Sequence, residues 1–131
     1  IFNSFSFIDA NYTSGAFKGN RIEAAPKIIE RAGLVYCNRN FSSTFQFNYT
    51  GDSFGDATNM KISDNPVAGY IPAYTVLDLS ATYKIDNFSI KCGINNLADH
   101  SYFTRRTDEY PGPGIIPAVG RSFYAGFTAK F

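Results

Sequence analysis

Hydrophobic and polar residues alternate with a period of two along most of this chain. The side chains of a β-strand point alternately to its two faces, so this period predicts strands that bury one face. The alternation is clearest at the end of the chain, in a set of residues that share one side: Phe123, Ala125, Phe127, Ala129 and Phe131. Signals for helices are weak, because the best candidate, 22–32, contains Pro26 and shows no sustained helical period.

Six segments carry the alternation, and most approach the 9–11 residues of a tilted membrane strand. The predicted strands are 1–12, 27–37, 41–51, 75–85, 88–95 and 123–131. Two connections between them are short, Asn38-Arg39-Asn40 and Asp86-Asn87, whereas 13–26, 52–74 and 99–120 are long and hold most of the Gly and Pro. Short turns at one end and long loops at the other are typical of outer-membrane β-barrels.

A soluble β-sandwich also alternates, so the character of the polar face decides between the two architectures. Here that face carries Ser, Thr, Asn, Gln and Gly with few charges, which favours a wet barrel lumen. We expect the following residues to face lipid: Phe45, Phe47, Leu77, Leu79, Ile90, Ile94 and Phe127. We expect Gln46, Asp78, Lys91 and Thr128 to face the lumen.

Composition supports this interpretation. Aromatic residues reach 17%, with 13 Phe and 9 Tyr, and aromatic girdles mark both interfaces of membrane barrels. No apolar run approaches the roughly 20 residues of a transmembrane helix. A net charge of +1 gives no electrostatic basis for a nucleic-acid partner. The chain lacks an initiator Met and a visible signal peptide, which suits a fragment or a processed chain.

Four groups of residues form motifs in sequence order: Gly19-Asn20-Arg21 with Pro26-Lys27, the strand 71–83, the stretch 93–99 (G-I-N-N-L-A-D) with Tyr102-Phe103, and Gly120-Arg121-Ser122-Phe123. Together they resemble the motifs of TonB-dependent outer-membrane receptors. The resemblance covers nearly the whole chain. It implies an antiparallel transmembrane β-barrel of about 22 strands, of which residues 1–131 supply the C-terminal six strands and their extracellular loops, without the plug domain.

A narrower resemblance concerns the long loop before the last strand. The stretches 102–106 (Y-F-T-R-R) and 110–117 (Y-P-G-P-G-I-I-P) are similar to a loop of ferric citrate receptors. Neighbouring residues of an extended chain point opposite ways, so we expect one of Arg105 and Arg106 to face the lumen. An Arg there suits the carboxylates of an anionic chelate. The alternative is a solvated loop in which Asp108 and Glu109 neutralise the pair.

The family resemblance also implies an assembly signal in the last strand, which the barrel-assembly machinery reads. Its residues are Tyr124, Gly126, Ala129 and Phe131, and Ala129 departs from the large apolar residue usual at its position. Asn95, Asn96 and Asp99 form a polar group without an arranged nucleophile or base. We therefore expect no catalysis, no metal site and no cofactor, and we expect these side chains to bond the backbone where a strand bends.

The leading hypothesis is a receptor in the outer membrane of a Gram-negative bacterium that takes up a ferric chelate, either ferric citrate or a siderophore. Its partners are the outer-membrane lipid, the chelate, the assembly machinery and, through the missing N-terminal part, the TonB complex. One alternative is a small, self-contained outer-membrane barrel with a structural or adhesive role. Another is a soluble β-barrel that binds a lipid-like ligand.

Overall fold

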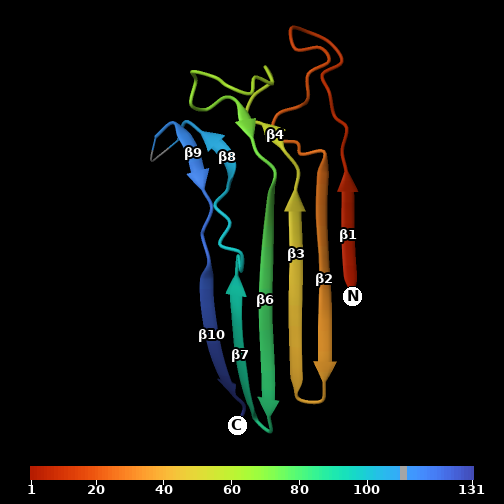
Figure 1. The fold of residues 1–131 in the computed structure, drawn as a ribbon, viewed down its shortest axis with the longest axis vertical. Helices are drawn as coiled ribbons and strands as arrows, with labels where there is room; N and C mark the ends of the chain where they lie inside the picture. Colours follow the sequence, from red (N-terminus) through yellow and green to blue (C-terminus); the bar gives the residue numbers. More distant parts are fainter. Residues whose placement is uncertain (110–111) are drawn as a thin grey trace.

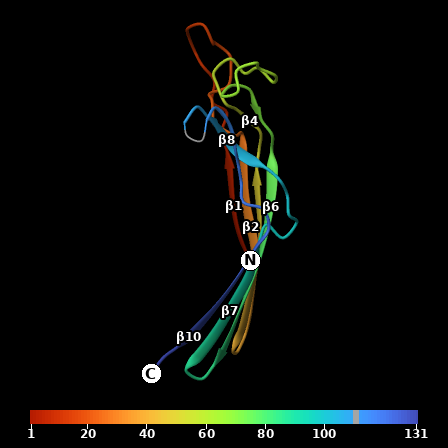
Figure 2. The ribbon, with the colours of Figure 1, turned by 90° about the vertical axis from the view of Figure 1, so that its left-hand side faces the viewer.

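The chain folds into one curved antiparallel sheet with loops gathered at one end (Figures 1 and 2). The computed structural model describes residues 1–109 and 112–131, and within them every regular element is a strand. The main sheet is formed by β1 (Phe2–Phe7), β2 (Ile28–Asn38), β3 (Phe41–Thr50), β6 (Tyr74–Ile85), β7 (Phe88–Asn95) and β10 (Ser122–Ala129). The loops contain four shorter strands, β4 (Ser53–Phe54), β5 (Tyr70–Ile71), β8 (Phe103–Thr107) and β9 (Gly114–Pro117).

The strand order in the sheet is β1-β2-β3-β6-β7-β10, so neighbours in sequence are neighbours in space once the loop strands are set aside. β1 and β10 lie at opposite edges and the sheet is open, as expected for part of a barrel (Figure 1). Two-residue turns join β2 to β3 and β6 to β7. Their first residues, Arg39 and Asp86, have φ values of 46° and 48°, which is the left-handed backbone that tight hairpins require.

The register places the predicted sets on opposite faces. Leu34, Phe45, Leu79, Ile94 and Phe123 stand in one row across the sheet, and Phe47 pairs with Leu77 on the same face. We call this the apolar face. Gln46 pairs with Asp78 on the other face, where Lys91 pairs with Thr82 and Gly126. We call this the polar face, and the predicted division of side chains is confirmed.

The apolar face is uncovered over most of its area. Phe127 is 65% exposed and Leu34 is 56% exposed, and Figure 2 shows a single layer of strands. Among the described residues the buried hydrophobic side chains are only Phe54, Ala68 and Ile71. A soluble barrel would turn its apolar face to its own core, so this sheet needs an apolar solvent or partner. No helix in the described residues is long and apolar enough to cross a membrane.

Two aromatic rings on the polar face lie directly over glycines of the neighbouring strand. Tyr124 of β10 pairs with Gly93 of β7, and a Cβ at Gly93 would lie 2.5 Å from the Tyr124 ring. Phe2 of β1 covers Gly33 of β2 in the same way, at 2.2 Å. Glycine is therefore required at both positions for the rings to reach the backbone. Lys91 Nζ lies 5.7 Å from the centre of the Tyr124 ring, within reach of a cation–π contact.

The structure corrects two details of the sequence interpretation. The first strand ends at Phe7 rather than at Tyr12, because the chain then leaves the sheet and pairs irregularly with 20–27, including an isolated bridge between Asn11 and Arg21. The long connections are also not plain loops, since they contain the four short strands. These strands have two to five residues, which is too short for a period of two to be recognised.

Candidate functional site

The three long connections meet at one end of the sheet and form what we call the loop cap. They are the β1–β2 loop (8–27), the β3–β6 loop (51–73) and the β7–β10 loop, described over 96–109 and 112–121, and these described parts lie toward the upper end of Figure 1. The described buried residues other than glycine all belong to the cap: Ser53, Phe54, Ala68, Ile71 and Asn96. The cap is therefore the part of the chain that has a small core of its own.

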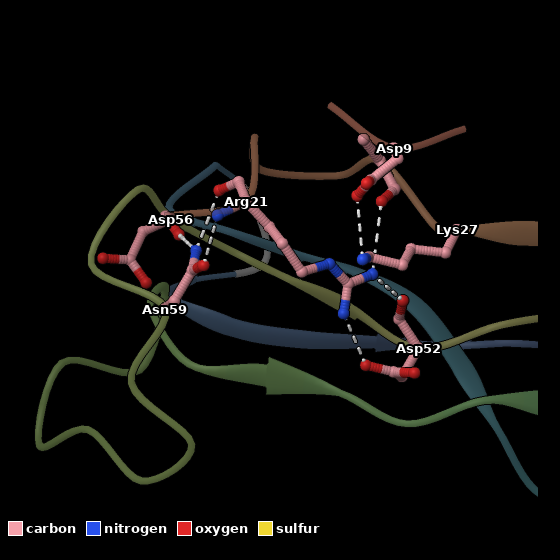
Figure 3. Close-up of polar contacts among 7 residues, drawn as sticks. Asp9, Arg21, Lys27, Asp52, Asp56 and Asn59 are labelled. Carbon is pink, nitrogen blue, oxygen red and sulfur yellow. Dashed lines mark hydrogen bonds and ion pairs between the residues drawn. The ribbon is translucent and has the colours of Figure 1, made fainter. Parts of the chain in front are cut away.

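Arg21 fastens the β1–β2 loop to the β3–β6 loop (Figure 3). Its guanidinium donates to Asp52 Oδ2 at 2.8 Å and to the Asp52 backbone oxygen at 2.7 Å, and it lies 5.5 Å from the Phe54 ring centre. Its backbone amide donates to Asn59 Oδ1 at 2.6 Å, and Asn59 Nδ2 donates back to the Arg21 carbonyl at 2.9 Å. Asn20 adds a bond from Nδ2 to the Ala57 oxygen at 2.9 Å.

Two carboxylates shape the same loops and have lowered pKa values. Burial opposes ionisation of Asp56, but hydrogen bonds from Thr58 and from the Gly69 amide outweigh it and hold the Asp56 pKa below its ordinary value. Asp9 accepts from Lys27 at 2.8 Å, and this bond and the ammonium charge lower the Asp9 pKa. Both carboxylates are thus kept ionised as structural acceptors.

Arg106 joins the β7–β10 loop to the β3–β6 loop. Its guanidinium donates to the carbonyl oxygens of Pro66 at 3.1 Å and Tyr70 at 3.3 Å, and it lies 5.5 Å from the Phe103 ring centre. Its Nε is buried without a hydrogen-bond partner among the described residues. A Cβ at Gly55 would lie 3.2 Å from Arg106 Cδ, so Gly55 leaves room for this side chain.

Arg105 differs from its neighbour. It is exposed, and its guanidinium forms no hydrogen bond or ion pair with residues 1–109 and 112–131. Asp108 and Glu109 make no ion pair with either arginine within the same range. Of the two arginines that the sequence suggested, Arg105 therefore has an exposed guanidinium with no partner among the described residues, whereas Arg106 holds the cap together.

Below the cap, the polar face forms an open hollow of about 460 Å³. Its lining comes from β6, β7, β10 and the β7–β10 loop: Val76, Asp78, Asn95, Asn96, Tyr102, Val119, Gly120 and Ser122. Tyr102 stacks on Tyr74 with ring centres 4.4 Å apart. Burial raises the Tyr102 pKa, and the nearby Tyr74 and Asp78 raise it further, so Tyr102 offers a neutral hydroxyl to the hollow. Carboxylate, amide and hydroxyl groups here could hydrogen-bond a polar solute.

Asn96 and Asp99 bond the backbone, as the sequence suggested, whereas the Asn95 side chain donates through Nδ2 to the Ser122 hydroxyl at 3.2 Å instead. Asn96 is 3% exposed, donates through Nδ2 to the His100 oxygen and accepts at Oδ1 from the His100 amide, both at 2.9 Å. Asp99 Oδ1 accepts from the Arg121 amide at 2.8 Å. Both residues have left-handed backbones. Together they fix the bend where β7 ends and set the start of β10.

The residues of the suggested assembly signal lie on or just beyond β10. Tyr124 and Gly126 are on the polar face and Ala129 is on the apolar face. Phe131 follows the strand and is fully exposed. Sequence reasoning had missed Asp52, Asp56 and Asn59, the partners that fasten the loops. Their only local signal is that Asp52 comes directly after the predicted strand 41–51.

Comparison with known proteins adds a family and a set of folds. Residues 1–97 match the family model described as "TonB dependent receptor-like, beta-barrel". A comparison with curated protein sequences gave no match. Among solved structures, the ferric citrate transporter FecA in its unliganded form has a TM-score of 0.79 at 24% identity, over 89% of this chain and 18% of that chain.

Two further receptors have the same fold. The siderophore receptor PiuA from Acinetobacter baumannii has a TM-score of 0.68 at 24% identity, over 86% of this chain and 15% of its own. The ferric yersiniabactin uptake receptor FyuA from Yersinia pestis has a TM-score of 0.69 at 19% identity, over 88% of this chain and 18% of its own. The present chain thus spans less than a fifth of the length of each of these structures.

Proposed function

Since the chain belongs to the TonB-dependent receptor-like β-barrel family, we propose that it forms part of an outer-membrane receptor that takes up a ferric chelate, with ferric citrate as the first candidate. The observation that carries this proposal is the exposed Arg105 on a loop cap fixed above the polar face. The fold of the ferric citrate transporter, matched over 89% of this chain, supports the same assignment.

In the proposed mechanism the cap captures the chelate and no covalent bond is made or broken. Arg105 pairs with a carboxylate of the chelate, since the planar guanidinium can donate two parallel hydrogen bonds. Arg106, by bonding to the Pro66 and Tyr70 carbonyls, fixes the strand from which Arg105 projects. The hollow beneath, where Tyr102 offers a hydroxyl, lies on the polar face along which the released chelate passes. The energy for release comes from the TonB complex acting on a plug domain outside these 131 residues.

We also assign the last strand a role in biogenesis. Tyr124, Gly126, Ala129 and Phe131 form the segment that the barrel-assembly machinery recognises. The aromatic alternation of 123–131 and the edge position of β10 in the open sheet support this role. An unpaired edge strand can pair with another strand, which is what stepwise assembly of a barrel requires.

The capture proposal is tested with single substitutions in the full-length receptor. Arg105→Gln keeps the bulk of the side chain and removes its charge. A charge-assisted bond to a carboxylate contributes about 1.5–3 kcal/mol, which is roughly ten- to a hundredfold in affinity. We expect the lower end because Arg105 is exposed. Arg121→Gln is the control, since Arg121 is also an exposed cation at this end of the sheet.

Binding of ferric citrate is measured by calorimetry at low and moderate salt. We expect Arg105→Gln to bind about tenfold more weakly than the wild type, with a flatter dependence on salt, and Arg121→Gln to bind normally. If Arg105→Gln binds as tightly as the wild type at both salts, the role of Arg105 is wrong. A wild-type receptor that binds only a neutral ligand, or one without iron, would remove the ferric citrate assignment and leave the barrel.

A further inference from the structure

Two hollows lie side by side on the apolar face, at the end of the sheet where the short turns are. One is apolar, about 280 Å³, and is lined by Tyr83, Ile85, Phe88, Ile90 and Phe127. The other is mainly polar, about 340 Å³, and is lined by Asn38, Arg39, Asn40, Phe41 and Tyr83. Tyr83 lines both. The two hollows therefore adjoin at the Tyr83 ring. We call the first the apolar compartment and the second the polar compartment.

The apolar compartment is formed by three adjacent strands. Tyr83 of β6 pairs with Ile90 of β7, which pairs with Phe127 of β10. The Phe88 and Phe127 rings are stacked with centres 5.6 Å apart, and both are largely exposed. A groove of this kind along membrane strands suits a hydrocarbon chain, because it has apolar walls and no polar group that needs a hydrogen bond.

The polar compartment presents one cation. Arg39 begins the β2–β3 turn with a left-handed backbone, and the turn is held in place by a hydrogen bond from the Lys84 amide to the Asn40 oxygen at 2.8 Å. The Arg39 guanidinium forms no ion pair or hydrogen bond with the residues that the structure describes. The side-chain amides of Asn38 and Asn40 add donors beside it.

The height of this site in the membrane follows from its tyrosine. Tyr83 separates the apolar from the polar compartment, and such amphipathic rings sit where the hydrocarbon meets the headgroups. Tyr36 and Phe41, whose ring centres are 6.2 Å apart, extend this aromatic band along β2 and β3. A chain that fills the apolar compartment would thus carry its headgroup at the level of Arg39.

We propose that the two hollows form one binding site for an anionic phospholipid of the membrane leaflet at the turn end. One acyl chain occupies the groove between Tyr83 and Phe127, and the phosphate pairs with Arg39. Basic residues beside apolar surface are a recurrent way to hold anionic lipid headgroups, and Arg binds phosphate through paired donors. The inference rests on the proposed outer-membrane location and is independent of the chelate and of the loop cap.

The test measures lipids bound to the full-length receptor by native mass spectrometry. The probes are phosphatidylglycerol and phosphatidylcholine with identical acyl chains. We expect the wild type to prefer phosphatidylglycerol, because the choline ammonium offsets the phosphate charge of phosphatidylcholine. Arg39→Gln should lower the affinity for phosphatidylglycerol about tenfold and that for phosphatidylcholine by less, so that the preference is lost. Arg121→Gln, which removes a cation at the opposite end of the sheet, is the control and should retain the preference.

A second pair of variants tests the acyl compartment. We expect Phe88→Ala to weaken the binding of both lipids severalfold, and Phe45→Ala, on the apolar face outside the groove, to weaken neither. Ile85→Ala replaces Phe88→Ala if the latter fails to show the heat-shifted gel mobility of a folded barrel. The proposal is overturned if the wild type binds the two lipids with equal affinity. It is also overturned if Arg39→Gln binds phosphatidylglycerol as tightly as Arg121→Gln does, or if the spectra show that a second copy of the receptor covers the face instead of lipid. Each of these results would leave chelate uptake untouched.

Discussion

The six-stranded sheet and the loop cap place their apolar side chains in opposite environments. On the sheet, large residues such as Phe127 and Leu34 are more than half exposed, whereas in the cap Ile71 is 3% and Phe54 is 9% exposed. The sheet therefore depends on the surrounding lipid for its stability. The cap depends on contacts that it makes with itself.

This difference in environment determines how specific the amino acid at each position must be. Any residue of suitable polarity and size can satisfy a strand position whose side chain faces lipid, because lipid adapts to its shape. A loop that is fastened by Arg21 to Asp52 and Asn59 requires those particular groups at those distances. The sheet should thus respond to changes of polarity, and the cap to the loss of individual hydrogen-bonding partners.

The largest effect is expected at Phe131, where a change should prevent the sheet, and with it the cap, from being assembled. Phe131→Asp places a charge at the end of the aromatic alternation that we assign to the assembly signal. We expect the level of the full-length receptor in the outer membrane to fall to a small fraction of normal while its synthesis continues. Quantitative blots of membrane fractions measure this, with Lys130→Gln as the control. Normal levels of the Phe131 variant would contradict the assignment.

Polarity on the two faces is tested at neighbouring positions of β6. Leu79→Arg puts a charge on the apolar face, which costs about 2–4 kcal/mol near the middle of a membrane. Ser80→Arg puts the same charge on the polar face, where water can solvate it. We expect the urea concentration that unfolds the barrel, followed by heat-shifted gel mobility, to fall for Leu79→Arg alone. Equal shifts for the two variants would refute the assignment of faces.

In the cap, the prediction concerns the loss of one hydrogen-bonding side chain, that of Arg21. Arg21→Met removes the bonds to Asp52 and should destabilise the closed arrangement of the loops by about 1.5–3 kcal/mol. The amide of Gly55, which donates to the Gly69 oxygen, should then exchange hydrogen faster, while amides of β3 and β7 keep their rates. Lys27→Met is the matched control, because the exposed Lys27–Asp9 pair contributes at most about 1 kcal/mol. The prediction fails if the two variants exchange alike.

The same difference explains what the sequence could predict. The faces of β3, β6, β7 and β10 follow from the alternation of their hydrophobic and polar residues. β1 and β2 alternate less regularly, since Phe2 lies on the polar face and Glu30 on the apolar face. The loop strands β4, β5, β8 and β9 could not be recognised, since each depends on a partner across a loop rather than on its own pattern. The sequence also left Arg105 and Arg106 equivalent. They are distinguished by the tertiary contacts of Arg106, above all by the Pro66 and Tyr70 carbonyls, which lie 40 and 36 residues away in the sequence.

The ring of Tyr124 over Gly93 has a consequence for the way in which the last strand finds its place. If β10 slid by two residues along β7, the alternation of faces would be preserved, so the hydrophobic pattern alone cannot reject that error. The slide would bring Tyr124 opposite Lys91 or Asn95. Each of these residues has a Cβ atom in the space that the ring needs, because even a Cβ built at Gly93 would lie 2.5 Å from the ring. The Tyr124–Gly93 pair thus excludes registers that the hydrophobic pattern alone would allow. Phe2 over Gly33 restricts the register of β1 in the same way at the other edge of the sheet.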